Sequence, residues 1–254
     1  MDLFTLIFGI FVLFLIIVIL YRRVFVTAGQ VGEKAVARRL RWLPKKEYFI
    51  INDLLFKRKN GHTTQIDHVV VSPYGIFVIE TKNISGYVYG SEYSKTWTRH
   101  WQGFTRGGHY TTNELSFDNP VLQNGAHVKA LYDELKQYHV KFVPIVAFSP
   151  EAELKISVQG VDVVYWSQIV EVIKRYKEPT ISIEQAREIF NLLQSINIID
   201  KKSRRQHVID ARNNKTSYNQ NTPPSSPITY RHGPLKGKES AETWAELNRM
   251  YNNQ

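Results

Sequence analysis

The chain opens with a long apolar segment, after which apolar residues recur at the spacings of strands and helices. From Leu3 to Leu20, only Thr5 and Gly9 interrupt the apolar residues. As a helix, this segment would rise roughly 27 Å, close to the hydrocarbon thickness of a bilayer. A core helix of a soluble domain would keep a polar face, and this segment has none. We therefore expect it to cross a lipid bilayer.

The residues that flank the apolar segment predict its orientation. Tyr21 suits the membrane interface, and Arg22 and Arg23 suit the cytoplasmic side. A cleavable signal peptide would begin with basic residues, whereas this N-terminus carries no Lys or Arg before the apolar segment. We expect residues 1–24 to form an uncleaved single-pass anchor, inserted through residues 3–20, with the rest of the chain in the cytoplasm.

After the anchor, the apolar spacing predicts an α/β domain. Val36, Leu40 and Leu43 recur at i, i+4 and i+7, which indicates a helix over Val31 to Leu43. Short, continuously apolar runs are typical of buried strands. The elements expected from these patterns are strands at 48–56, 65–71 and 75–82, a helix from Asn119-Pro120, strands at 142–148 and 161–165, and helices at 167–176 and 182–196. This order predicts a mixed sheet covered by helices on both faces.

The C-terminal part of the chain, residues 200–254, lacks this periodicity. Residues 200–237 are basic and polar and contain prolines, so we expect them to be disordered. Residues 240–251 could form one short helix with three apolar residues on a face. That helix would either dock a protein partner or remain marginal without one.

Composition narrows the classes of function. The chain has no cysteine, which excludes a disulfide scaffold, an iron–sulfur site, a thiolate zinc site and a cysteine nucleophile. No GxxxxGK[ST] sequence occurs, so nothing argues for an ATP-driven enzyme. The net charge of +10 favours anionic partners without choosing between nucleic acid and anionic lipid.

The segment from Ser72 to Gly75 has the residues of a type I turn and predicts the register of a hairpin. If the first and last residues of the turn pair, Asp67 faces Glu80 and Gln65 faces Lys82. Residues two apart in a strand share a face, so these four side chains would gather at the end of the hairpin away from the turn.

Two opposed carboxylates in a buried hairpin repel each other unless a cation compensates. A divalent cation held by Asp67 and Glu80 is one solution, and hard oxygen ligands suit Mg²⁺ or Mn²⁺. The other is an ion-pair cluster in which Lys82 neutralises one of the acids, and the residues alone leave both open. Glu33 extends the apolar stripe of the first helix, so a third carboxylate could point to the same layer.

Residues 87–110 interleave aromatic and basic side chains, a composition typical of surfaces that hold single strands by stacking and phosphate contacts. Lys95, Trp97, Arg99 and Arg106 are the candidate nucleic-acid-binding residues. The alternative is a β-excursion whose aromatic rings pack on the core.

Several motifs stand out in the first half of the chain: Gly32-Glu33, Gln65-Ile66-Asp67-His68, Gly75 to Asn83, Gly86 to Gly90, Trp97, and Asn119 to Asn124. Together they resemble those of the nuclease-related domain (NERD) family. The resemblance covers roughly residues 29–150, and the family is related to the PD-(D/E)XK nuclease superfamily. It implies a restriction-endonuclease-like core of α-β-β-β-α-β order in residues 25–150, which the strand and helices of residues 151–199 complete.

The resemblance also implies roles for individual residues. Asp67 and Glu80 would be the metal ligands, and Lys82 the active-site lysine. Glu33 would be an auxiliary acid on the first helix, and Gln123 the polar residue that related nucleases carry on a later helix. Two positions depart from the pattern: Ile66 stands in place of the nominal proline, and His127 replaces a tyrosine four residues after Gln123.

Three functions from different classes follow. The first is a nuclease-like enzyme of the bacterial cell membrane that uses Mg²⁺ or Mn²⁺ to hydrolyse nucleic acid, DNA rather than RNA, in DNA processing. The second is a catalytically inactive nuclease fold that serves as a membrane-tethered module for binding nucleic acid or protein. The third is an envelope-associated scaffold whose tail recruits partners.

Overall fold

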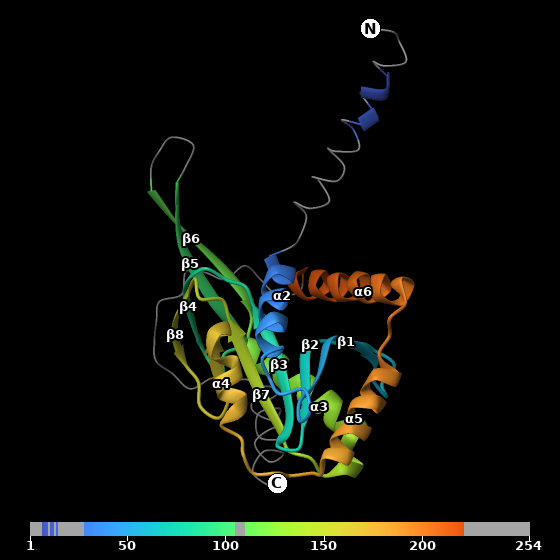
Figure 1. The fold of residues 1–254 in the computed structure, drawn as a ribbon. Helices are drawn as coiled ribbons and strands as arrows, with labels where there is room; N and C mark the ends of the chain where they lie inside the picture. The colour runs from blue at the N-terminus through green and yellow to red at the C-terminus, as the bar shows by residue number, and fades with distance from the viewer. Residues whose placement is uncertain (1–6, 10, 13, 15–27, 105–109, 221–254) are drawn as a thin grey trace.

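The structure is a computed structural model that describes residues 7–9, 11–12, 14, 28–104 and 110–220 (Figure 1). The main sheet, sheet A, has the strand order β1-β2-β3-β7-β9. Its strands are β1 (Phe49–Lys57), β2 (Thr63–Ser72), β3 (Gly75–Lys82), β7 (Phe142–Phe148) and β9 (Asp162–Tyr165). The pairs β1–β2 and β2–β3 are antiparallel, whereas β7 runs parallel to both β3 and β9.

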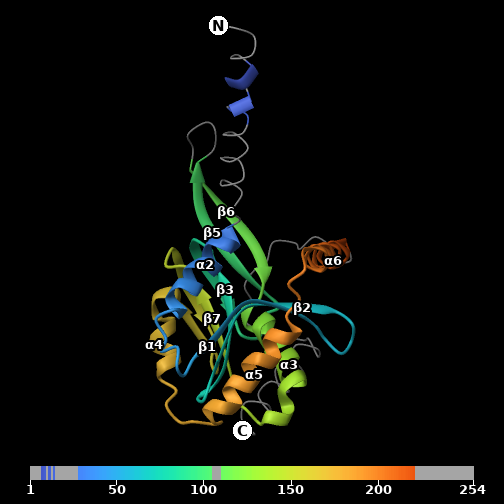
Figure 2. The ribbon, with the colours of Figure 1, turned by 45° about the vertical axis from the view of Figure 1, so that its right-hand side comes forward.

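Helices cover both faces of sheet A, as the apolar spacing predicts. On one face α3 (Pro120–Leu135) and α5 (Ile183–Ile196) pack against the sheet, with η1 (Lys136–Tyr138) after α3. On the other face lie α2 (Ala28–Leu40) and α4 (Ile169–Lys174), which η2 (Trp166–Gln168) precedes. The two views show these helix pairs on opposite sides of the sheet (Figures 1 and 2).

Two helix starts show how local sequence sets the element boundaries. Asn119 caps α3 by accepting a hydrogen bond from the Val121 N–H, and Pro120 occupies the first helical position. Ser182 and Gln185 exchange side-chain and backbone hydrogen bonds in a capping box at the start of α5. Both starts lie where the sequence predicts them.

A second sheet, sheet B, corrects the expectation of a single sheet. Its order is β6-β5-β4-β8, with β4 (Gly86–Ser91), β5 (Thr96–Phe104), β6 (Tyr110–Asp118) and β8 (Ala152–Ser157). Most described residues of β5 and β6 are not buried, so these strands lack the continuous apolar runs that mark buried strands. A third apolar cluster, which includes Val88, Trp97 and Phe148, connects the two sheets.

The N-terminal apolar segment lies largely outside the described residues. Within the described part of the chain, no helix is long and apolar enough to cross a membrane. The membrane anchor over residues 1–24 therefore stays a prediction.

The expectation of disorder directly after Asp200 is wrong for residues 201–220, which form α6 (Lys201–Gln220). Asp200 caps this helix by accepting a hydrogen bond from the Ser203 N–H at 2.8 Å. Arg204 fixes the helix to β1 through an ion pair with Asp53 at 2.7 Å. The Arg204–Asp53 contact attaches α6 to the domain, although the sequence of α6 lacks an apolar face. The short helix expected at 240–251 lies outside the described residues.

Candidate active site

The β2–β3 hairpin has the register that the turn predicts. Ser72 pairs with Gly75, and the ladder continues in that register as far as His68 and Ile79. Beyond this pair the two strands diverge. Asp67 Oδ2 accepts a hydrogen bond from the Thr81 backbone N–H at 2.8 Å, in the place where a strand-to-strand backbone bond would be expected.

The β1–β2 pairing is irregular at the same level. Asp53 has a left-handed backbone with φ of 59°, which is uncommon for a residue other than glycine. Ile51 and Leu54 both contact the apolar cluster between the sheet and α3, although they are three residues apart. Because strict alternation would place them on opposite faces, the alternation of β1 is broken at Asp53, and the register of β1 with β2 is the same on either side of it. Non-glycine residues with such backbones tend to cluster at functional sites.

Gln65 and Lys82 do not face each other as the extrapolated register predicts. Gln65 Nε2 donates to Asp53 Oδ1 at 2.8 Å, so this side chain turns to β1. Lys82 Nζ donates to Glu80 Oε1 at 2.8 Å and to Gln123 Oε1 at 2.9 Å. The lysine therefore joins the end of β3 to α3.

Glu80 is the most enclosed acid of the site. Its exposed fraction is 3 %, and its second oxygen, Oε2, lies 3.4 Å from His127 Nε2. Burial alone would raise the pKa of Glu80, but the neighbouring Lys82 and His127 outweigh burial and lower it. Glu80 is thus held as a carboxylate.

Asp67 has the opposite electrostatic environment. Burial, followed by the negative charge of Glu80, raises the pKa of Asp67 to about 8, although the Thr81 hydrogen bond acts in the other direction. Partial burial also raises the pKa of Glu33, with Asp53 and Glu80 adding to the effect. These shifts place Glu33 near the same acids, as the stripe on the first helix predicts.

The acids suit a metal ion that is completed by other ligands. Among the described residues, no group of three or more His, Asp or Glu side chains could hold a metal ion by itself. Mg²⁺ commonly binds through one or two carboxylates and takes its remaining ligands from water and substrate phosphates. A cation beside Asp67 would also relieve the repulsion that raises the pKa of this acid. Asp67 and Glu80 therefore fit Mg²⁺ or Mn²⁺.

Three participants of the site, His127, Thr64 and Asp53, were not predicted from the sequence as site residues. His127 lies four residues after Gln123 in α3, so helical spacing places both side chains on one face, and this signal could have found it. Thr64 Oγ1 lies 3.2 Å from His127 Nδ1 and holds the ring toward Glu80. Asp53 had no such signal, because its position depends on the irregular backbone of β1.

The candidate nucleic-acid-binding residues have different environments in the structure. The prediction that Trp97 stacks on nucleic-acid bases is wrong, because its exposed fraction is 0 % and its ring stacks on Phe148, with the ring centroids 6.0 Å apart. A side chain at Gly90 would collide with this ring, which explains the glycine there. Arg99 is partly exposed, with its guanidinium 4.2 Å from the Trp101 ring.

Of the other two candidates, Lys95 is exposed on β4–β5, whereas Arg106 lies outside the described residues. The predicted catalytic residues therefore converge, whereas the described nucleic-acid-binding candidates lie on sheet B or in its β4–β5 turn, with Trp97 buried in its core.

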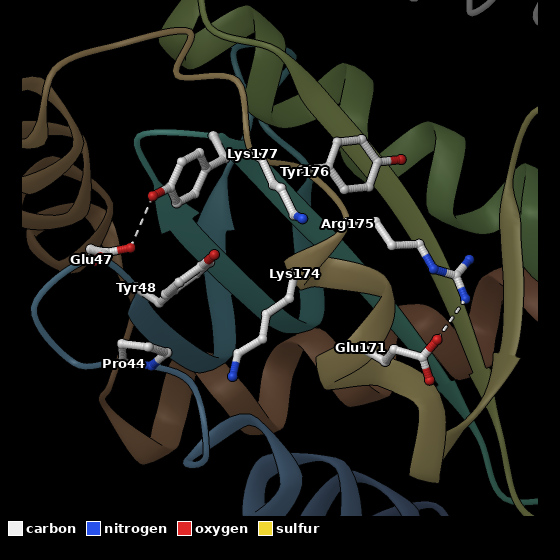
Figure 3. Close-up of a pocket in the computed structure, with 9 residues that line it drawn as sticks. Pro44, Glu47, Tyr48, Glu171, Lys174, Arg175, Tyr176 and Lys177 are labelled. Carbon is white, nitrogen blue, oxygen red and sulfur yellow. Dashed lines mark hydrogen bonds and ion pairs between the residues drawn. The ribbon is translucent and has the colours of Figure 1, made fainter.

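A cavity of about 770 Å³ lies at the opposite end of sheet A, beside the β2–β3 turn (Figure 3). Its polar groups pair with one another: Tyr74 donates to Glu47 at 3.0 Å, and Arg175 contacts Glu171 at 3.3 Å. None of the predicted catalytic residues lines it. The cavity is thus separate from the candidate active site.

The comparisons with known proteins agree with the motif resemblance. The Nuclease-related domain (NERD) matches residues 28–149. An uncharacterized protein of Bacillus anthracis is 34% identical over 183 residues, which span 71% of this chain and 82% of that relative. The chain belongs to the nuclease-related domain family. A solved protein of unknown function aligns with 90% of this NERD chain and 100% of its own, at 14% identity and a TM-score of 0.28, which is too low to carry an argument.

Proposed function

We propose that this NERD protein hydrolyses phosphodiester bonds of nucleic acid with the help of a divalent cation at the site around Asp67, Glu80 and Lys82. One observation carries the proposal: Lys82 Nζ donates hydrogen bonds to both Glu80 and Gln123. Beside it, Asp67 of the adjacent strand β2 accepts a hydrogen bond from the Thr81 N–H. Two side chains, Glu80 of β3 and Gln123 of α3, thus hold the ammonium group of Lys82.

The spacing of these residues supports a placement within the PD-(D/E)XK superfamily. Glu80-Thr81-Lys82 supplies an acid and a lysine two residues apart, so both lie on one face of β3. Asp67 supplies the preceding acid from the adjacent strand. In this placement DNA is a better substrate than RNA, because the implied role of the family is DNA processing.

Each side chain has a distinct task in the proposed reaction. Asp67 and Glu80 would hold Mg²⁺ or Mn²⁺, which supplies a polarised phosphoryl oxygen and a bound water of lowered pKa. Lys82 Nζ donates hydrogen bonds to the attacking oxygen or to the developing charge on the phosphate. Gln123 Oε1 orients this ammonium, and His127 fixes Glu80 from the other side.

The cleavage test uses the full-length chain with supercoiled plasmid and single-stranded oligonucleotide, in Mg²⁺ and in EDTA. We expect cleavage in Mg²⁺ only, and Asp67→Ala or Lys82→Ala should lower the rate by about 100-fold or more. Lys174→Ala, an exposed lysine at the far end of sheet A, is the matched control and should cleave like the wild type. Circular dichroism confirms that each variant is folded.

Two results would overturn parts of this proposal. If both site variants cleave as fast as the wild type, the site is wrongly assigned. If the wild type neither binds Mg²⁺ by calorimetry nor cleaves, the inactive nucleic-acid-binding or protein-interaction module takes its place, and Lys82 is part of a structural ion cluster.

The proposal includes location: a single-pass anchor in the bacterial cell membrane with the NERD domain in the cytoplasm. Its support is the apolar segment from Leu3 to Leu20 and the arginine pair that follows it. A further partner bound through the C-terminal tail is part of the same proposal.

A further inference from the structure

Helix α6 is fixed to the strands of the candidate site by its inner face. Arg204 Nη1 pairs with Asp53 Oδ2 at 2.7 Å, and Arg204 Nη2 donates to the Asp53 backbone carbonyl at 2.9 Å. Three residues on, His207 Nδ1 lies 2.7 Å from Thr63 Oγ1. Because i and i+3 share a helix face, these two side chains define the side of α6 that meets the domain.

The inner face of α6 is only a few contacts away from Glu80. His207 contacts Thr63, and the next residue of β2, Thr64, contacts His127 at 3.2 Å. His127 in turn lies 3.4 Å from Glu80. Figures 1 and 2 both show α6 at the end of sheet A where β3 passes into β4, which is the end that carries Glu80 and Lys82.

The outer face of α6 is basic. Lys201, Lys202 and Arg205 are exposed, and no acidic side chain lies between residues 201 and 209. Lys201 and Arg205 are four residues apart and form one row along the helix. The next acid, Asp210, accepts a hydrogen bond from Gln206 at 2.8 Å. The first two and a half turns therefore present three positive charges, and the two flanking acids accept hydrogen bonds within α6, Asp200 as its cap and Asp210 from Gln206.

We infer that the outer face of α6 binds the phosphate backbone of a nucleic acid and sets the position of that strand relative to Lys82. This inference rests on the proposed function, which it extends by assigning a substrate-binding surface. Lys and Arg on one helix face are the groups that bind phosphates without reading sequence. A strand held there is positioned with respect to the chemistry, because α6 is joined through β1 and β2 to Asp67 and Glu80.

The test compares two triple charge reversals in the full-length chain. The first is Lys201→Glu, Lys202→Glu and Arg205→Glu on α6. The second is Lys174→Glu, Arg175→Glu and Lys177→Glu, three exposed cations at the opposite end of sheet A. Both variants change the net charge equally, so the control separates a local contact from the general attraction of a basic protein.

Binding of labelled single-stranded and duplex oligonucleotides is measured by fluorescence anisotropy in EDTA, over a series of salt concentrations. We expect the α6 variant to bind at least about tenfold more weakly, with a salt dependence reduced by about two to three phosphate contacts. The far-end variant should keep the wild-type slope. Unchanged binding by the α6 variant, or equal losses in both variants, would overturn the inference.

A second readout separates this inference from the proposed function. Hydrolysis of bis(p-nitrophenyl) phosphate in Mg²⁺ reports the site alone, because so small a diester does not extend to α6. We expect the α6 variant to keep this activity and to lose cleavage of oligonucleotides. If the wild type hydrolyses neither substrate but α6 reversal still weakens binding, the proposed function fails and the binding surface stands.

An anionic bilayer is the competing partner for a basic helix, and one probe distinguishes the two. Gln206→Cys gives a unique labelling site on exposed α6, because the chain has no cysteine. A dye at this position should respond to oligonucleotide in the full-length chain reconstituted in zwitterionic vesicles. A blue shift in phosphatidylglycerol vesicles without a response to oligonucleotide would overturn the inference.

Discussion

Asp67 shows how a single residue can be costly for folding and suited to binding. Its carboxyl accepts one backbone hydrogen bond but lies partly buried beside Glu80, which leaves its pKa at about 8. Titratable residues whose environment shifts their pKa at a cost to folding stability are typical of functional sites. The same position can therefore be probed through folding as well as through activity.

The Asp67 pKa predicts how the stability of the metal-free protein depends on pH. Because the folded-state pKa is raised above the ordinary value of 3.8, the folded protein keeps a proton that the unfolded chain has lost, and stability falls as pH rises from about 4 to about 8. Asp67→Asn removes this penalty. We expect the variant in EDTA to be more stable than the wild type at pH 8, by about 1 to 3 kcal/mol, and to bind Mg²⁺ more weakly.

Thermal unfolding at pH 5 and pH 8 checks this prediction, since the gain should shrink at the lower pH. A variant less stable than the wild type at pH 8 would show that Asp67 is already stabilised in the absence of metal.

His68 gives a pH dependence of opposite sign. Burial lowers the pKa of His68 to about 4, and its Nδ1 lies 2.7 Å from Asn52 Oδ1. Because the folded protein favours the neutral ring, the contribution of His68 to folding stability is fully present above the ordinary pKa of 6.5. This contribution is lost as pH falls from 6.5 to 4. The two pKa values differ by an amount worth about 3 kcal/mol. His68→Gln should therefore lose less stability than the wild type over this interval.

Chemical denaturation at pH 7 and pH 4.5 measures the effect, with His62→Gln at an exposed histidine as the control. Parallel losses in the wild type and His68→Gln would mean that another group causes the acid sensitivity.

At the scale of elements, polar anchors hold the β4–β5 turn and α6, whose described residues belong to none of the three apolar clusters. Asn119 caps α3 and also donates from Nδ2 to the carbonyls of Ser91, Glu92 and Ser94, which joins the helix to the β4–β5 turn. Arg204 anchors α6 to β1 in the same way. These contacts connect residues far apart in the chain, so the local sequence does not predict them.

The anchoring role of Arg204 predicts a change in the dynamics of α6. Arg204→Met keeps a long side chain but removes the contacts to Asp53, so the helix should detach more often. We expect amide hydrogens over residues 201–211 to exchange at least about tenfold faster, because about 1 to 2 kcal/mol of local stability is lost. Arg205→Met, on the exposed face of the same helix, is the matched control for hydrogen exchange by mass spectrometry. Equal exchange in both variants would show that α6 is held by other contacts.

At the scale of the whole molecule, the candidate active site and α6 share one end of sheet A, where α2 also begins (Figures 1 and 2). Seven residues, 21–27, connect the predicted membrane-inserted residues 3–20 to α2, and even fully extended they span only about 25 Å. If the anchor is in the membrane, this end of the domain works close to the bilayer. Substrate must then reach the site near that surface.

The predicted topology can be tested in cells. Lys46→Cys introduces a single thiol in the exposed loop between α2 and β1, because the chain has no other cysteine. We expect the protein to remain in the membrane fraction after carbonate washing and to react with an impermeant maleimide only after the cells are permeabilised. Labelling of intact cells would show that the predicted orientation is wrong. Release by carbonate would show that the predicted anchor does not hold the protein in the membrane.

The parts of the structure that the sequence predicted correctly are those that local interactions specify. The turn from Ser72 to Gly75 was sufficient for the hairpin register, because turn geometry and side-chain alternation act over a few residues. The capped starts of α3 and α5 follow for the same reason. Family motifs then singled out Asp67, Glu80 and Lys82.

The sequence by itself thus determined the α/β order and the hairpin register as far as His68 and Ile79, since short-range sterics and hydrogen bonds specify them, while family motifs indicated the acid–lysine set. Only the tertiary structure decided that Lys82 meets Gln123, that Asp53 disturbs β1 opposite Asp67, and that a polar basic stretch becomes α6. These contacts join residues separated by tens of positions. Their free energy comes from burial and pairing in the folded chain, which no local pattern of residues contains.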